Sequence, residues 1–145
     1  MDFIRPVTSG RRGAILSMEL VLILPIILVL IFSIVEFSML MSAQTRVATA
    51  AQNGARLMSL CTYSDEEVQE TVRSQLGPEL AAESEILIQP AVHAGEIGRV
   101  TIRVPMSKAS PDLLWMTGFS LKDRFINADV PMVMERTAVL DRTWN

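Results

Sequence analysis

Apolar residues fill the stretch from Ala14 to Ala43 almost without a break, apart from a few hydroxyls, Pro25, Glu19 and Glu36. A helix needs about 20 mostly apolar residues to cross a bilayer. A cleaved secretory signal has a shorter apolar region of about 7–15 residues. A buried helix would need cover on nearly every side, which the remaining residues are too few to provide. The pattern therefore predicts a membrane-spanning helix over residues 14–43.

The helix is expected to continue beyond the membrane through residues 44–60, because this stretch lacks proline and is rich in alanine, the best helix former. Two interpretations of the alanine surface remain open: it packs on the chain's own domain, or it packs against other subunits. A second helix starts at Ser64, which forms a capping box with Glu67. It presents one apolar face (Val68, Val72, Leu76) and ends at Gly77-Pro78.

Alternation with a period of two residues predicts strands in the C-terminal half. The predicted strands are residues 85–89, 99–106 and 128–134, and a glycine-containing turn region covers residues 91–98. A short helix is predicted from Ser110 to Trp115, with Pro111 at its first position. The expected fold class is α+β: a long N-terminal helix packed by a small three-stranded antiparallel sheet with one or two short helices.

Charge at the flanks of the apolar segment predicts its orientation. Three arginines precede it (Arg5, Arg11 and Arg12), whereas only Arg46 lies close on the other side. The positive-inside rule places the N-terminal stub in the cytoplasm. The expected organisation is a basic cytoplasmic leader (residues 1–13), a single transmembrane helix (residues 14–43) and an extracytoplasmic α+β domain (residues 44–145). A net charge of −3 and the lack of a basic patch argue against a nucleic-acid partner.

The two glutamates need an explanation, because a carboxylate in hydrocarbon is costly unless it is near an interface, neutral or paired. Glu19 lies six residues after Gly13. Glu36 lies 17 residues after Glu19, which is about 25 Å along a helix. Both side chains then reach the headgroups at opposite interfaces. The alternative is that the helix meets other helices in an assembly and the two acids pair there.

Catalytic, cofactor and metal sites are not predicted. His93 is the only histidine and Cys61 the only cysteine, which is too few for a metal site of the usual kind. Trp115, Phe119 and Phe125 are interpreted as core residues in preference to an exposed binding patch. The sequence predicts a protein that is not an enzyme and shows no sign of a small-molecule substrate.

The N-terminal segment resembles the TadE-like family, the minor pilins or pseudopilins of tight-adherence (Flp-type) pilus systems. The resemblance covers roughly residues 11–58 and is carried by three motifs: Arg11-Arg12-Gly13, the stretch Met18-Glu19-Leu20-Val21-Leu22-Ile23-Leu24-Pro25, and Ile34-Val35-Glu36-Phe37. A weaker echo of the family's closing apolar strand runs from Asn127 to Glu135.

The resemblance implies that the α+β fold is pilin-like, with a structural function in the bacterial inner membrane and assembly through the N-terminal helix and its acids Glu19 and Glu36. It also implies that a prepilin peptidase cuts between Gly13 and Ala14. Glu19 would then be the sixth residue of the mature chain, one beyond the usual fifth. In such assemblies this glutamate meets the freed amino terminus of a neighbouring subunit. The alternative function is an uncleaved, single-pass membrane-anchored module that binds an envelope partner.

Overall fold

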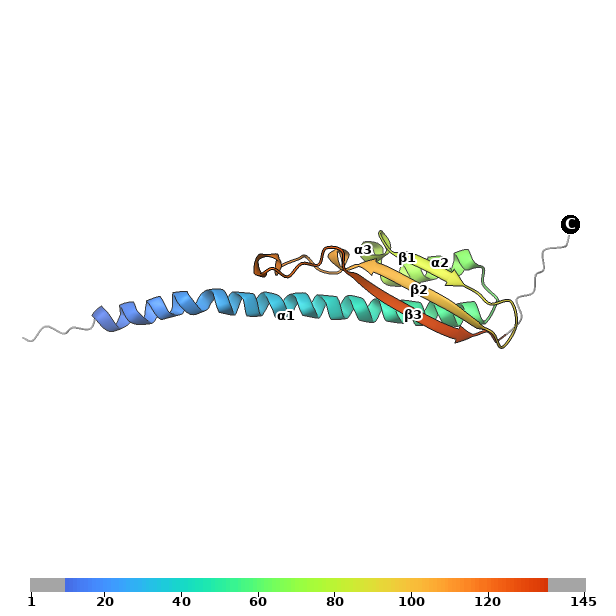
Figure 1. Cartoon of the computed structure of the whole chain (residues 1–145), viewed down its shortest axis with the longest axis horizontal. Helices are drawn as coiled ribbons and strands as arrows, with labels where there is room; N and C mark the ends of the chain where they lie inside the picture. Colours follow the sequence, from blue (N-terminus) through green and yellow to red (C-terminus); the bar gives the residue numbers. More distant parts are fainter. Residues whose placement is uncertain (1–9, 136–145) are drawn as a thin grey trace, which may run out of the picture.

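A single helix, α1 (Gly10–Ser59), runs the length of the molecule and carries a small head domain on its C-terminal half (Figure 1). The computed structural model describes the backbone of residues 10–135 and the side chains of residues 18–135. Within this part of the chain, Met18–Ser59 is long and apolar enough to cross a membrane, and almost none of its most apolar stretch is buried in the protein. The predicted leader falls mostly outside the described residues.

Two short helices follow α1. The first, α2 (Asp65–Leu76), starts with the predicted capping box, in which the Glu67 amide donates to the Ser64 hydroxyl and the Ser64 amide donates to the Glu67 carboxylate. The predicted apolar face of α2 is buried. Gly77 ends α2 with a positive φ, and α3 (Pro78–Ala81) follows with proline at its start. The helix α3 was not predicted, because four residues are too few for a periodic pattern.

The sheet is antiparallel, in the order β1 (Glu85–Gln89), β2 (Ile97–Pro105) and β3 (Phe125–Val133). The central strand pairs on both sides. The three predicted strands are present, although β2 starts two residues earlier than expected and β3 three residues earlier. The predicted fold class, an α+β head on a long helix, is confirmed.

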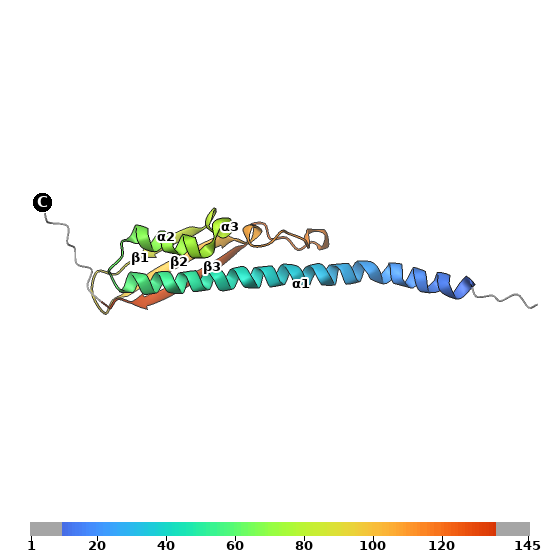
Figure 2. The same ribbon diagram turned by 180° about the vertical axis from the view of Figure 1, so that it is seen from behind.

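The core of the head lies between the inner face of the sheet, α2 and one face of α1 (Figure 2). Four of the alanines of α1 are buried there: Ala43, Ala50, Ala51 and Ala55. Gly54 lies where α1 and α2 approach closely, since a Cβ atom at this position would be 2.7 Å from Cγ2 of Val72. Small residues on this face of α1 therefore bring the helix close to its own head domain.

The connection between β2 and β3 differs from the prediction. The short helix expected from Ser110 to Trp115 is absent; the connection instead contains two 3₁₀ helices, η1 (Met106–Lys108) and η2 (Trp115–Thr117). Asp112, which stands next to the expected helix start, accepts a hydrogen bond from the Ser120 hydroxyl eight residues later (3.0 Å). This contact closes a loop, so the proline precedes a turn and not a helix.

Candidate functional site

Glu19 and Glu36 have very different surroundings on α1. Glu19 is exposed, among apolar side chains that are also exposed. Glu36 is 1% exposed and is the most deeply buried charged residue among the described ones. The two glutamates are about 25 Å apart along the helix. Only the second therefore belongs to a site that this chain forms by itself.

The head domain covers Glu36 with part of the β2–β3 connection, which we call the docking loop (residues 111–124). The Leu114 amide donates a hydrogen bond to Oε2 of Glu36, with an N–O distance of 3.1 Å. These two residues are 78 positions apart in the sequence. In Figure 1 the docking loop extends from the head along α1, toward the N-terminal half of the helix.

Hydrogen bonds within the docking loop hold the Leu114 amide in place. The Thr117 hydroxyl donates to the Leu114 carbonyl (2.7 Å), and Gly118 turns the chain with a left-handed conformation. The Ser120 hydroxyl donates to Asp112 and accepts from the Lys122 amide (3.2 Å). A loop tied at several points presents its backbone donor to the carboxylate at little further entropic cost.

The second oxygen of the Glu36 carboxylate, Oε1, is buried without a hydrogen-bond partner among the described residues. Its surroundings are apolar: an open groove of about 380 Å³ beside Glu36 and Leu114 is lined by Ser33, Ile34, Phe37, Leu40 and Phe119. A buried polar atom without a partner is unfavourable. The site therefore has unused capacity for one more hydrogen-bond donor.

This arrangement was not predicted from the sequence. Headgroups and neighbouring helices were the expected surroundings of Glu36, and the chain's own backbone was not among the alternatives. A main-chain amide carries no residue-type signal, so the contact could not be found from motifs. The uncharged run from Leu113 to Leu121 was the available sign that this loop lies against something apolar. An assembly role for Glu19 and Glu36 stays a prediction.

The aromatic residues Trp115, Phe119 and Phe125 are exposed, so their interpretation as core residues was wrong. Trp115, the first residue of η2 within the docking loop, is 66% exposed. Phe125 lies on the outer face of β3, where the Arg103 guanidinium stacks 3.9 Å from its ring centre. For Trp115 and Phe119, the error arose because the docking loop leaves the sheet and follows α1, a path that the alternation of residues does not reveal. Phe125 instead lies in the sheet and faces away from the core.

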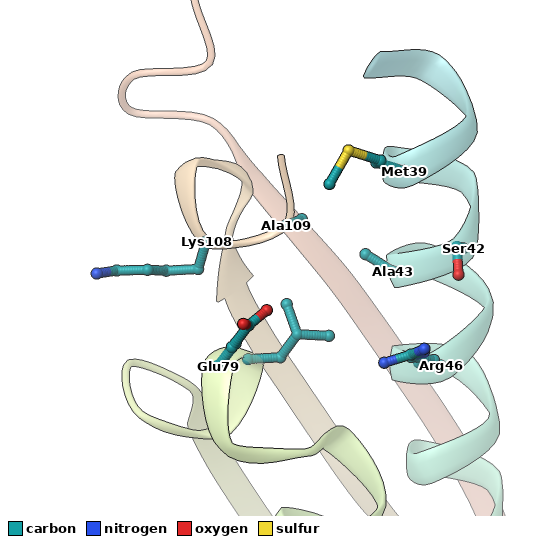
Figure 3. Close-up of a pocket in the computed structure, with 8 residues that line it drawn as sticks. Met39, Ser42, Ala43, Arg46, Glu79, Lys108 and Ala109 are labelled. Carbon is teal, nitrogen blue, oxygen red and sulfur yellow. The ribbon is translucent and has the colours of Figure 1, made fainter. Parts of the chain in front are cut away.

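The structure also shows a pocket at the seam between α1, α3 and η1 (Figure 3). Arg46 reaches into it from α1, facing Glu79 on α3, whereas Lys108 points away and pairs with Glu83. Charged side chains at such an exposed seam contribute little to stability, and those described here form no catalytic arrangement. Among the described residues there is no group of three side chains able to hold a metal ion.

Gly13 and Ala14, the predicted cleavage residues, lie within the N-terminal turns of α1, where the structure describes the backbone alone. His93 is exposed in the β1–β2 turn, and its amide donates to the Glu96 carboxylate (3.1 Å). Cys61 is half-buried just after the end of α1. These positions bring together no nucleophile, base and acid among the described residues.

Replacement of Glu36 by alanine is expected to release the docking loop. The Leu114 amide loses its acceptor, which costs about 1–3 kcal/mol of local stability. Hydrogen exchange of peptides spanning Leu114, measured by mass spectrometry in detergent micelles, should become faster. Glu36→Gln keeps an acceptor oxygen and should retain most of the protection, and Glu19→Ala is the matched control on the exposed glutamate. Equal protection in Glu36→Ala and the unmodified chain would show that this hydrogen bond does not hold the loop.

Comparison with known proteins adds one assignment. Residues 15–56, less than half of the chain, match the family model described as TadE-like protein, in agreement with the resemblance carried by the motifs around Glu19, Pro25 and Glu36. The matched segment lies entirely within α1. This family implies a structural protein associated with a tight-adherence pilus system, and the long apolar helix is consistent with membrane anchoring. No curated protein and no solved structure matches the chain.

Proposed function

We propose that this TadE-like chain is a minor pilin or pseudopilin that contributes to assembly of a tight-adherence pilus, with a structural and not a catalytic role. The division of α1 into two parts carries the proposal. Its C-terminal part packs one face on the head domain, whereas the apolar part from Met18 to Val35 is exposed on nearly all sides. An all-round apolar helix needs lipid or other helices around it.

Two environments fit this exposed helix in turn. Before assembly, lipid covers it in the inner membrane, with the N-terminal stub in the cytoplasm and the head outside. During assembly, helices of other pilin-like subunits take the place of lipid. The exposed carboxylate of Glu19 then meets the amino terminus of a neighbouring subunit. Such a pair sets the register between helices, because a buried charge is tolerated when it is paired and costly when it is alone.

Removal of the leader creates that amino terminus. A prepilin peptidase cuts between Gly13 and Ala14 on the cytoplasmic side, so residues 1–13 leave with their arginines. The competing function, an uncleaved anchored module for an envelope partner, keeps the leader in place. The state of the N-terminus therefore distinguishes the two functions.

Intact-mass analysis of the protein purified from membranes of cells that carry the pilus system tests this step. We expect a mature chain that begins at Ala14. Gly13→Leu is expected to abolish processing, because a bulky side chain replaces the glycine at the cut. Gly10→Leu, a matched change three residues earlier, should leave processing unchanged. An intact leader in the unmodified chain would favour the anchored-module alternative.

A further inference from the structure

The tip of the docking loop, around Trp115 and Met116, is an apolar exposed surface of the head domain. Residues 113–121 carry no charge over nine positions. Trp115 and Met116 at the tip are 66% and 79% exposed, and Phe119 is exposed beside them. An exposed tryptophan next to an exposed methionine is unusual for a loop surrounded by water. This surface therefore requires a covering that the chain does not supply.

The contact between Leu114 and Glu36 fixes the position of this tip along α1. The groove under the loop involves residues 33–40 of the helix. The uncharged segment of α1 runs from Leu20 to Val35, about 24 Å at 1.5 Å per residue, and Glu36 ends it. A hydrocarbon core is about 30 Å thick. The docking loop lies beside this part of α1 (Figures 1 and 2). With Glu19 at one interface, the loop is then expected at the level of the opposite interface.

The composition of the loop suits the boundary between hydrocarbon and headgroups. Tryptophan is enriched at this depth, because its ring is largely apolar and its indole N–H is polar. The uncharged run is followed by three exposed charged residues, Lys122, Asp123 and Arg124, two of which are cations. The Arg124 guanidinium lies 5.0 Å from the ring centre of Phe119. Cations beside an apolar tip are placed to interact with lipid phosphates.

We propose that residues 113–119 form a second membrane contact, in which Trp115 and Met116 enter the outer interface of the bilayer beside α1. The head domain then rests on the membrane, and the bond between Glu36 and Leu114 couples the depth of the loop to the depth of the helix. The covering is lipid because the tip continues the apolar surface of the spanning helix at the same level. The proposal rests on membrane insertion of α1 and is independent of leader cleavage and pilus assembly.

Tryptophan fluorescence of the full-length chain in vesicles tests the contact. Trp144→Phe leaves Trp115 as the only tryptophan. The protein is reconstituted in phosphatidylcholine–phosphatidylglycerol vesicles with and without lipids brominated on their acyl chains near the headgroup. We expect blue-shifted emission, strong quenching by the brominated lipids and weak quenching by aqueous acrylamide.

A matched reporter at the other end of the head supplies the control. Tyr63→Trp, combined with Trp115→Phe and Trp144→Phe, places the only tryptophan just beyond the end of α1, about 35 Å from Glu36, judged from the 23 residues between Glu36 and Ser59 at the helical rise. This reporter should be quenched by acrylamide and not by brominated lipid. Flotation of the vesicles shows separately that α1 is inserted in each variant.

Three results would overturn the proposal while flotation confirms insertion. Trp115 emission quenched by acrylamide alone would place the loop in water. Protection from both quenchers would show that protein covers the tip, as in contact with a second subunit. Quenching by brominated lipid that is equal for both reporters would mean that the docking loop has no special relation to the membrane. None of these results bears on the state of the N-terminus, so the proposed function is tested independently.

Discussion

Replacement of Ile102 by alanine is expected to destabilise the head domain by about 2–5 kcal/mol, the usual cost of removing a large buried aliphatic side chain. Ile102 is fully buried at the middle of the central strand, where it pairs with Ile86 on β1 and with Ala128 on β3. Its side chain faces the core that the sheet shares with α1. Loss of this contact weakens the attachment of the head to the helix as well as the sheet.

Ile97 on the same strand provides a matched control. It is 65% exposed, compared with 0% for Ile102, so the same chemical change should alter stability by no more than about 0.5 kcal/mol. Pulse proteolysis of each variant in urea, in detergent micelles, gives the unfolding midpoint of the head. Equal midpoints for Ile102→Ala and Ile97→Ala would contradict the described packing of the sheet on α1.

Replacement of Glu19 by alanine is expected to abolish incorporation of the chain into the pilus. In the proposed assembly, the carboxylate pairs with the amino terminus of a neighbouring subunit. Removing one partner of a buried ion pair costs about 3–5 kcal/mol, because the other charge stays buried alone. Glu19→Gln keeps the size of the side chain and removes its charge, so it should fail as well. The measurement is the amount of the chain in sheared pilus fractions, relative to its amount in membranes.

Leu20→Ala, at the next position of the same helix, is the control for this experiment. It removes apolar surface without altering charge, and incorporation should persist. Normal incorporation of both Glu19 variants would show that the carboxylate has no role in assembly. Membrane levels of all variants should be equal, since Glu19 is exposed and contributes nothing to packing of the head.

The elements that local chemistry defines were predictable from the sequence. The Ser64–Glu67 capping box marks the start of α2, and alternation of Val100, Ile102 and Val104 marks the buried face of β2. These signals act over a few residues, and a sheet with one solvent face preserves them. The alanines of α1 were recognised as a packing surface, but their partner became clear only when the structure placed the head against them.

The docking loop was not predictable in the same way. Pro111 after Ser110 is typical of a helix start, yet Asp112 pairs with Ser120 and closes a loop. The position of this loop depends on a contact between Glu36 and a backbone amide 78 residues away, which no local pattern encodes. The interpretation of Trp115 and Phe119 as core residues failed for the same reason. A large apolar side chain suggests a core position wherever the path of the chain is unknown.

These observations give the two parts of α1 distinct tasks. The C-terminal part orders the head domain, and Glu36 fixes the docking loop at the outer boundary of the apolar segment. In the proposed function, the exposed apolar surface of the N-terminal part contacts lipid and then neighbouring subunits. Glu19, exposed within this surface, is the group available for pairing between chains.

Site-specific photocrosslinking tests the central claim that other pilin-like subunits cover the exposed part of α1. A photoreactive residue replaces Leu22, which is exposed in the apolar part of the helix, in cells that carry the pilus system. The same residue at Tyr63, an exposed position at the far end of the head, is the control. The account predicts protein adducts at Leu22 that contain a second pilin-like subunit and that disappear in Glu19→Ala. Adducts with lipid alone at Leu22, in cells that assemble the pilus, would contradict it.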